Sequence, residues 1–204
     1  MVITIGREFG SGGKYIGEKL AEELGIKIYD KEILSKAAEE MGIDLEVLER
    51  IDEKQEQSFW YTYAMGMYSS QESIETLNEV PSNEKLFIEQ AKIIEELAKK
   101  EDCIIIGRCS NIILKNKPNV LNIFVYSSDM NFKINRKMKY GNFKDIYEAE
   151  KMIQTIDEER AKYYNYYTGK EWGNKDDFDL LIDTSKIGVD NTVKLLKDYI
   201  SYKK

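Results

Sequence analysis

The chain has 204 residues, of which 33% are charged and 42% are hydrophobic, proportions that are ordinary for a globular protein. This length can bury one good core and leaves room for a small subdomain or lid, but not for a second full domain. The formal net charge of −7 argues against a nucleic-acid-binding protein, because such proteins generally present a basic face to the phosphates.

Strands and helices are predicted to alternate along the chain, because short apolar runs alternate with segments of helical periodicity. The predicted strands are 2–5, 26–29, 103–106, 119–126 and 178–183. The predicted helices are 13–25, 31–41, 44–57, 83–100, 109–115, 129–140, 145–167 and 189–202. Asp30 is expected to cap the helix at 31–41. This alternation predicts an α/β protein whose parallel sheet is covered on both faces and binds ligands at the carboxyl ends of its strands.

A glycine-rich turn joins the first predicted strand to the first predicted helix within residues 2–17, a layout that proteins use to hold phosphate. Gly10, Gly12 and Gly13 can adopt the positive φ values of a tight anion-binding turn. Their backbone N–H groups would then point at one anion, supported by the helix N-terminus. Lys14 can place its ammonium group on the outer phosphates. The alternative is a strand-to-helix turn that is glycine-rich for purely structural reasons.

The P-loop pattern GxxxxGK[ST] fits this turn at its Gly-Lys pair but not at two other positions. Its first glycine falls on Glu8, and its metal-binding hydroxyl falls on Tyr15, whose ring cannot replace a short Ser or Thr side chain. Mg²⁺ prefers near-octahedral oxygen ligands. The metal must therefore draw them from a nucleotide, from water and from Asp30 or Ser11, or be held weakly.

Polar residues follow every predicted strand, where the ligand of a parallel sheet is expected. Among them, Arg108 comes after a small residue that allows close backbone approach, and its guanidinium can bind phosphate bidentately. The alternatives for this residue are a surface arginine or an ion pair with Asp30. The strand-end residues are Arg7 and Glu8, Asp30 and Lys31, Gly107, Arg108 and Asn111, Ser127 to Asp129, and Asp183 to Ser185.

The predicted helix 145–167 carries Asp157 and Arg160, which share one face at i, i+3 spacing. An arginine there can act as a lid residue that stabilises charge on a transferring phosphoryl group. The alternative is a surface ion pair, which would contribute little to stability. The tyrosines at 163–167 and the aromatic side chains at 58–68 are interpreted as packing residues, with stacking on a nucleobase as the alternative.

The absence of histidine narrows the possible chemistry. It excludes Ser/Cys-His triads, imidazole bases and most zinc sites, whereas phosphoryl transfer needs little beyond carboxylates, Lys, Arg and backbone dipoles. No segment reaches the roughly 18 apolar residues of a membrane span, so a cytoplasmic protein with no membrane partner is expected. Cys103 and Cys109 are accordingly expected to be reduced thiols.

Four segments resemble, in order and spacing, the successive motifs of the cytidylate kinase-like proteins: ITIGREFGSGGKYIGEKLAEELGIKIYDKEIL, IIIGRCSNIIL, DEERAKYYNYYTGKEWG and FDLLIDTSKIG. This family belongs to the P-loop kinases, near the nucleoside monophosphate kinases, and the resemblance is weakest at 50–82. It implies a three-layer α/β/α P-loop kinase fold with a five-stranded parallel sheet in the order 2-3-1-4-5. It also implies a single domain, 1–204, with a helical acceptor-binding insert at 43–82 and a lid region at 137–175.

The resemblance assigns roles to the residues that match the family motifs. Residues implied to bind the ATP phosphates are Gly10, Ser11, Gly12, Gly13, Lys14 and Tyr15. Residues implied to bind the acceptor are Arg7, Asp30, Lys31, Arg108 and Asn111, with Asp30 and Ser11 near the metal. The catalytic set comprises Lys14, Arg108, Asp157 and Arg160. Tyr15-Ile16 and Cys109 depart from true cytidylate kinases, which carry Gly-Thr or Ser-Thr and an Asp at these positions.

The implied activity is ATP- and Mg²⁺-dependent phosphoryl transfer to a nucleoside monophosphate, with CMP or dCMP as the first choice of acceptor. Two alternatives remain open: a small-molecule kinase whose pocket is shaped by the aromatic segment 58–68, and a nucleotide-binding or regulatory protein without catalysis. The expected partners are nucleotide substrates and no nucleic acid, in a monomer or a homodimer.

Overall fold

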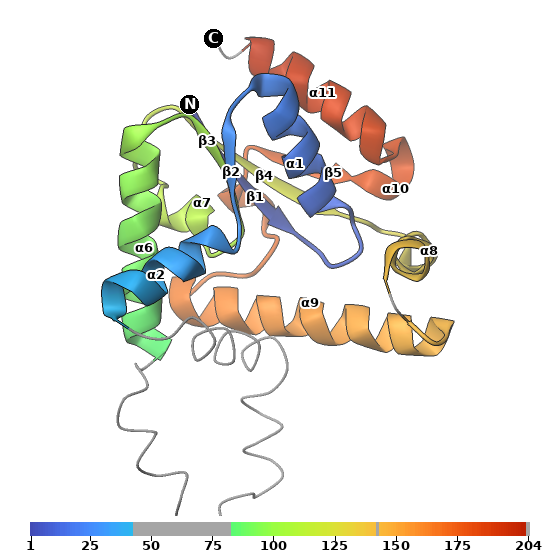
Figure 1. Cartoon of the computed structure of the whole chain (residues 1–204). Coiled ribbons are helices and arrows are strands. Elements are labelled where there is room, and N and C mark those ends of the chain that lie inside the picture. Colours follow the sequence, from blue (N-terminus) through green and yellow to red (C-terminus); the bar gives the residue numbers. More distant parts are fainter. Residues whose placement is uncertain (43–82, 142, 203–204) are drawn as a thin grey trace, which may run out of the picture.

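The computed structural model describes residues 1–42, 83–141 and 143–202 (Figure 1). The predicted helix at 44–57, the aromatic segment 58–68 and the acceptor-binding insert at 43–82 lie outside these residues. Within the described ranges, no helix combines the length and apolar character that a membrane span requires.

Five parallel strands form one sheet, in the order β2-β3-β1-β4-β5, which confirms the predicted fold and strand order. In the β1–β3 register Ile5 lies opposite Ile106, and in the β1–β4 register it lies opposite Ile123. Because these three strands run in phase, the residues that follow them emerge at one edge of the sheet. The strands are β1 (Val2–Arg7), β2 (Lys27–Tyr29), β3 (Cys103–Ile106), β4 (Val120–Tyr126) and β5 (Leu180–Asp183).

Helices cover both faces of the sheet, as Figure 1 shows. On one face, α1 (Gly13–Leu24) lies beside α11 (Val189–Tyr202). On the other face, α2 (Glu32–Met41) packs on α6 (Asn83–Lys100), with the short α7 (Ser110–Ile113) beside α6. A further pair, α8 (Met130–Tyr140) and α9 (Ile146–Thr168), packs together, and α9 runs along the edge where the strands end (Figure 1).

The two cores explain why the central strand β3 is apolar at every position. Ile104 and Ile106 point into the core formed with α1 and α11, whereas Cys103 and Ile105 point into the core formed with α2 and α6. All four side chains are fully buried. A continuous apolar run is the pattern expected of a parallel strand with both faces covered. The sheet is therefore a rigid support for the polar residues at its carboxyl edge.

Several predicted boundaries differ from the structure by one or two residues, and the contacts explain two of these differences. Asp30 does not cap α2: the N-cap position is Lys31, without a side-chain cap, because the Asp30 carboxylate is engaged by cations instead. Strand β5 begins at Leu180 rather than at 178, because Phe178 packs on Phe124 and the Asp179 carboxylate accepts a hydrogen bond from the backbone N–H of Asn122, at 2.7 Å. A 3₁₀ turn (Lys175–Asp177) precedes the strand, and a short helix, α10 (Thr184–Ile187), follows it.

Candidate active site

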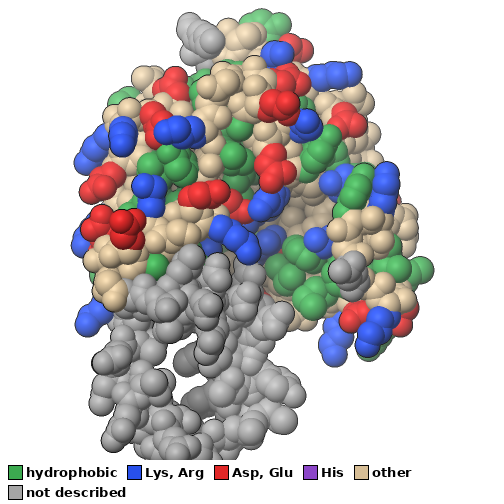
Figure 2. Space-filling model, in the orientation of Figure 1, with side chains coloured by type: hydrophobic (Ala, Val, Ile, Leu, Met, Phe, Trp, Pro, Cys, Tyr) green, Lys and Arg blue, Asp and Glu red, His purple; other side chains and the backbone are tan. Residues whose placement is uncertain are grey.

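A cavity of about 290 Å³ opens at the carboxyl ends of β1 and β3. In Figure 2, Lys and Arg side chains lie around the hollow near the centre of this face. All five residues predicted to bind an acceptor line the cavity, and so do three of the four predicted catalytic residues, one of which, Arg108, belongs to both sets. These seven residues are Arg7, Lys14, Asp30, Lys31, Arg108, Asn111 and Arg160. The structure thus brings together residues from four separate stretches of the sequence.

The charge of the cavity is strongly asymmetric. Five cationic residues line it, against two carboxylates, Asp30 and Glu159. A concave, positively charged surface with partly buried walls attracts and orients anions. Although the whole chain is acidic, this cavity therefore suits a ligand that carries phosphate.

The side chain of Arg7 is held between two glycines. A Cβ atom at Gly13 would lie 2.5 Å from Arg7 Cβ, and one at Gly107 would lie 2.0 Å from Arg7 Nη1. The guanidinium also lies 3.6 Å from Asp30, while Arg160 donates a hydrogen bond to the Arg7 carbonyl at 3.2 Å. Gly107, the small residue before Arg108, therefore leaves room for the Arg7 side chain rather than for a backbone segment.

Gly107→Ala is expected to destabilise the protein by about 1–2 kcal/mol, because an L-residue is strained at its φ of +70°, and also to displace the Arg7 guanidinium. Gly25→Ala is the matched control, since its φ is +65° and nothing lies within 4 Å of the added Cβ. Denaturant unfolding should show similar losses for both variants, whereas only Gly107→Ala should weaken anion binding in the cavity. Equal anion binding by the two variants would contradict the assigned position of Arg7.

Three consecutive residues after β3 adopt left-handed backbone conformations. Gly107, Arg108 and Cys109 have φ values of 70°, 57° and 55°. Such conformations are costly for residues other than glycine and often occur at functional sites. Backbone hydrogen bonds stabilise this turn, from the Gly107 N–H to Ile5 O and from the Ser110 N–H to Gly107 O, both at 3.0 Å. The turn places Arg108 at the cavity, and burial raises the pKa of the Cys109 thiol to about 12, so it stays protonated.

Asp30 is the carboxylate at the centre of the cationic cavity. It lies 3.0 Å from Lys14 Nζ and receives a hydrogen bond from it. Burial opposes ionisation, but the charges of Arg7, Lys14 and Arg108 outweigh it and lower the pKa of Asp30. The hydrogen bond from Lys14 to Asp30 in turn raises the pKa of Lys14. The Asp30 carboxylate and the Lys14 ammonium are therefore both charged at neutral pH. The cavity thus contains one anionic oxygen ligand, on Asp30, next to a cation.

The glycine-rich turn has the predicted positive φ values at Gly10 and Gly12, but the prediction is wrong for Gly13, which is already the first residue of α1. Gly10 and Gly12 have φ values of +82° and +93°, and Gly12 is the N-cap of α1. Ser11 is fully buried, and its hydroxyl donates to the Glu8 carbonyl at 2.8 Å. The hydroxyl would have to leave this bond to bind a metal, so its metal role stays a prediction.

Tyr15 points away from Asp30. Its hydroxyl lies 3.3 Å from Asp190 of α11, and 39% of the residue is exposed. The ring is therefore not part of the core, although it stands where a P-loop Ser or Thr is expected.

Asp157 and Arg160, the predicted pair on α9, lie in two different environments. Arg160 lines the cavity, whereas Asp157 lies against the glycine-rich turn and accepts a hydrogen bond from the Phe9 N–H at 2.6 Å. Burial raises the pKa of Asp157 above its ordinary value, although the Phe9 N–H and the Lys133 ammonium act against it. Both side chains of the pair are largely buried, so the surface ion-pair interpretation does not describe them.

Helix α8 brings cations to the turn that sequence reasoning missed. A Cβ at Gly12 would lie 3.2 Å from Arg136 Nη2, and Lys137 Nζ lies 3.6 Å from the centre of the Phe9 ring. Burial, reinforced by Arg160 and Arg136, lowers the pKa of Lys137. The sequence signal was the spacing of basic residues along one helix, at positions 133, 136 and 137.

Aromatic side chains form the other wall of the cavity: Tyr163, Tyr164, Trp172 and Phe178. Asn111 donates a hydrogen bond to the Tyr164 hydroxyl at 2.9 Å, and burial raises the pKa of Tyr164 to about 12. Tyr167 stacks on Phe87 of α6 with ring centres 4.2 Å apart. Tyr163 and Tyr167 therefore pack against Phe87 of α6, as interpreted, whereas Tyr166 is largely exposed. Tyr163 and Tyr164 also face the cavity.

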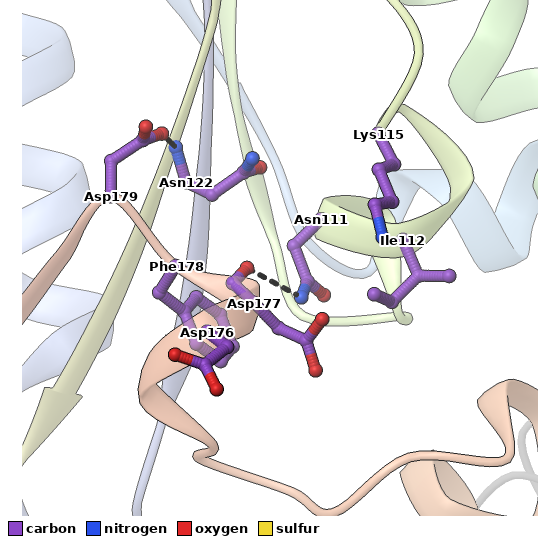
Figure 3. Close-up of a pocket in the computed structure, with 8 residues that line it drawn as sticks. All are labelled: Asn111, Ile112, Lys115, Asn122, Asp176, Asp177, Phe178 and Asp179. Carbon is purple, nitrogen blue, oxygen red and sulfur yellow. Dashed lines mark hydrogen bonds between the residues drawn. The ribbon is translucent and has the colours of Figure 1, made fainter.

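A second cavity, of about 200 Å³, lies behind Asn111 and is drawn in Figure 3. Three aspartates line it, Asp176, Asp177 and Asp179, against a single lysine. Asn111 donates to the backbone carbonyl of Asp177, so this wall is held by structural hydrogen bonds. Its acidic character does not suit a phosphate ligand.

Comparison with known proteins gives consistent matches along the chain. The model of the cytidylate kinase-like family matches residues 2–186. The cytidylate kinase of Methanopyrus kandleri is 25% identical over 205 residues, which cover 97% of this chain and 91% of that protein. The crystal structure of an uncharacterized protein from Eubacterium ventriosum matches 98% of both chains with a TM-score of 0.72 and 28% identity. A shikimate kinase from Bacteroides thetaiotaomicron, at 13% identity and a TM-score of 0.56 over 98% of both chains, shares the fold.

Proposed function

Because the chain belongs to the cytidylate kinase-like family, we propose that it transfers the γ-phosphoryl group of ATP to a nucleoside monophosphate, with CMP or dCMP as the acceptor. The observation that carries this proposal is the cavity at the carboxyl ends of β1 and β3, where five cationic residues meet beside a glycine-rich turn. Two phosphate-bearing substrates must approach each other there, and this concentration of positive charge offsets their mutual repulsion.

The glycine-rich turn is the proposed site for the ATP phosphates. The backbone N–H groups of Gly10 to Lys14 lead into the N-terminus of α1, which favours anions. Lys14 reaches the same region from the first turn of the helix, and Arg136 and Lys137 approach it from α8. We assign these cations to the polyphosphate, and residues 137–175 to the lid that carries Arg160.

The cavity itself is the proposed acceptor site. Arg7 and Arg108 provide guanidinium groups for the acceptor phosphate, since both line the cavity and Arg7 is fixed by its neighbours. The aromatic wall offers a flat surface for a base, and Asn111 and Glu159 offer polar groups that can discriminate between bases. Lys31 adds positive charge at the rim.

The residues present fit Mg²⁺ brought in with the nucleotide. Asp30 is an ionised carboxylate inside the cavity, and Mg²⁺ is commonly held by one or two carboxylates together with substrate phosphates and water. In the part of the chain that the structure describes, no cluster of three or more His, Cys, Asp or Glu side chains could hold a metal. Asp30 would be the first protein ligand, with the Ser11 hydroxyl as the second predicted one, and the ion would neutralise charge on the phosphates.

The protein's own contribution to the transfer is positioning and charge stabilisation. Lys14 of α1 and Arg160 of α9 both line the cavity. Held there, Lys14 and Arg160 stabilise the negative charge of the transferring group, while Arg7 and Arg108 keep the acceptor in line with it. No covalent intermediate with the protein is needed, in agreement with the protonated thiol of Cys109.

A panel of acceptors assayed with ATP and Mg²⁺ tests this proposal. The highest kcat/KM is expected for CMP or dCMP among the nucleoside monophosphates, with small non-nucleotide alcohols and acids as comparison acceptors. Preference for a non-nucleotide acceptor would identify a small-molecule kinase with another substrate. Tight ATP binding without turnover of any acceptor would identify a nucleotide-binding or regulatory protein.

Tyr15→Ser is expected to strengthen the dependence of ATP affinity on Mg²⁺, because it restores a short hydroxyl at the metal-binding position of the P-loop pattern. Stability should change by only about 0.5 kcal/mol, since the ring is exposed. Calorimetric titration of ATP at several Mg²⁺ concentrations measures the effect, with a thermal melt as the control. Rapid turnover by the wild-type protein at low Mg²⁺ would refute the idea that Tyr15 weakens metal binding.

A further inference from the structure

A buried lysine lies directly beneath the glycine-rich turn. Lys133 of α8 is 5% exposed, and its Nζ lies 2.6 Å from Glu8 Oε2 and 3.1 Å from Asp157 Oδ2. A buried ammonium group is costly unless it is paired in this way. These three residues, here called the charged triad, connect the turn with α8 and α9.

Each carboxylate of the charged triad also holds the backbone. Glu8 Oε2 accepts a hydrogen bond from the Ser127 N–H at the end of β4, at 3.0 Å, and Asp157 Oδ1 accepts one from the Phe9 N–H. A Cβ at Gly10 would lie 2.9 Å from Lys133 Cβ, so the turn rests on the lysine itself. The path of the turn from Glu8 to Gly10 therefore depends on where the two carboxylates are held.

The triad also sets the local charge. It carries two negative charges and one positive charge beside a turn proposed to bind the most negative substrate. Without the ammonium, two carboxylates would remain partly buried at this position, and Arg160, which lies 3.9 Å from Asp157 Oδ1, would compensate only part of their charge. They would repel each other and a bound polyphosphate, and both effects would move the turn from its binding geometry.

We propose that Lys133 is a positioning residue for nucleotide binding: it holds Glu8 and Asp157 together, and through them it fixes the backbone of the turn for the ATP phosphates. This inference rests on the proposed function, because the ligand is the nucleotide assigned to that turn. Asp157 then acts on nucleotide binding indirectly, through its hydrogen bond from the Phe9 N–H. The ion pair with Lys133 would also explain why Glu8 stands at the first glycine position of the P-loop pattern.

Three variants test the proposal. Lys133→Met keeps the length of the side chain but removes its charge. Combining Lys133→Met with Glu8→Gln and Asp157→Asn removes all three charges and retains amide oxygens that can accept the same backbone hydrogen bonds. Lys139→Met is the matched control, since Lys139 is exposed on the same helix. Titration calorimetry measures ATP affinity, and hydrogen exchange of amides 8–13 reports the turn in the ligand-free protein.

Lys133→Met should weaken ATP binding on the order of 30-fold or more and accelerate amide exchange at 8–13, while Lys139→Met leaves both unchanged. The triple variant should recover most of the affinity and the slow exchange, which loss of packing alone would not allow. Wild-type affinity in Lys133→Met, or no recovery in the triple variant, would overturn the proposal. If Lys133→Met does not fold, ATP affinity and amide exchange at 8–13 are measured on the triple variant instead, and they test the proposal in the same way. Absence of ATP binding by the wild-type protein would instead refute the proposed function, and the exchange pattern would still test the role of Lys133.

Discussion

Lys14→Ala is expected to lower kcat on the order of 100- to 1,000-fold, the usual loss when one charge-stabilising group is removed from a transition state. Lys14 is the first side chain after the glycine-rich turn and extends into the acceptor cavity, where its Nζ lies 3.0 Å from Asp30. Its side chain is 54% exposed, so it remains accessible to a ligand. The KM for the acceptor should change little, because the acceptor phosphate is assigned to the arginines. Steady-state kinetics with both substrates varied measures this separation.

Lys19→Ala is the matched control for this variant. Lys19 lies on the same helix, but it is exposed, forms an ion pair with Glu22 at 2.7 Å and does not line the cavity. It should retain wild-type kcat. A kcat for Lys14→Ala within a few-fold of this control would place the lysine outside the site of phosphoryl transfer.

Arg108→Ala should produce the opposite kinetic signature, a large rise in the acceptor KM with a smaller change in kcat. The loss of a desolvated charged contact costs on the order of 2–4 kcal/mol, which corresponds to roughly 30- to 800-fold in affinity. A strained left-handed turn holds the Arg108 backbone at the carboxyl end of β3, and the residue lines the cavity there.

Arg108→Lys separates charge from geometry in the same experiment. A lysine keeps the positive charge but cannot form the bidentate contact of a guanidinium, so the acceptor KM should fall between those of wild type and alanine. An unfolding titration controls for stability, because the turn carries strain of its own. Small and equal changes in kcat and KM for both Arg108 variants would show that this residue does not bind the acceptor.

The sheet could be predicted from the sequence because its signals are local. The apolar run at Cys103–Ile106 reads as a buried strand without any knowledge of its neighbours, and its four side chains alternate between two cores as such a strand requires. The same holds for the positive φ values of Gly10 and Gly12, which follow from the turn chemistry of one short segment. The strand order came from the family resemblance, and the structure confirms it.

The interior of the site could not be predicted, because its contacts join distant residues. Arg7 depends on Gly107 for room, and Lys133 depends on Glu8 and Asp157 for its charge partners. Local reasoning placed Asp30 as a helix cap, since it could not include the two cations that engage the carboxylate across the fold. Such pairings become visible only when the carboxyl ends of the strands are brought together.

Transfer of labelled phosphate from ATP to CMP is the most direct test of the central claim that this cavity serves phosphoryl transfer between nucleotides. The purified protein is incubated with ATP labelled at the γ-phosphate, Mg²⁺ and CMP, and the products are separated by chromatography, with Lys14→Ala and Arg108→Ala run in parallel. Label is predicted to appear in CDP with the wild-type protein, and at much lower rates with the two variants. No labelled nucleoside diphosphate from CMP or any other nucleoside monophosphate, under conditions where ATP is bound, would contradict the account.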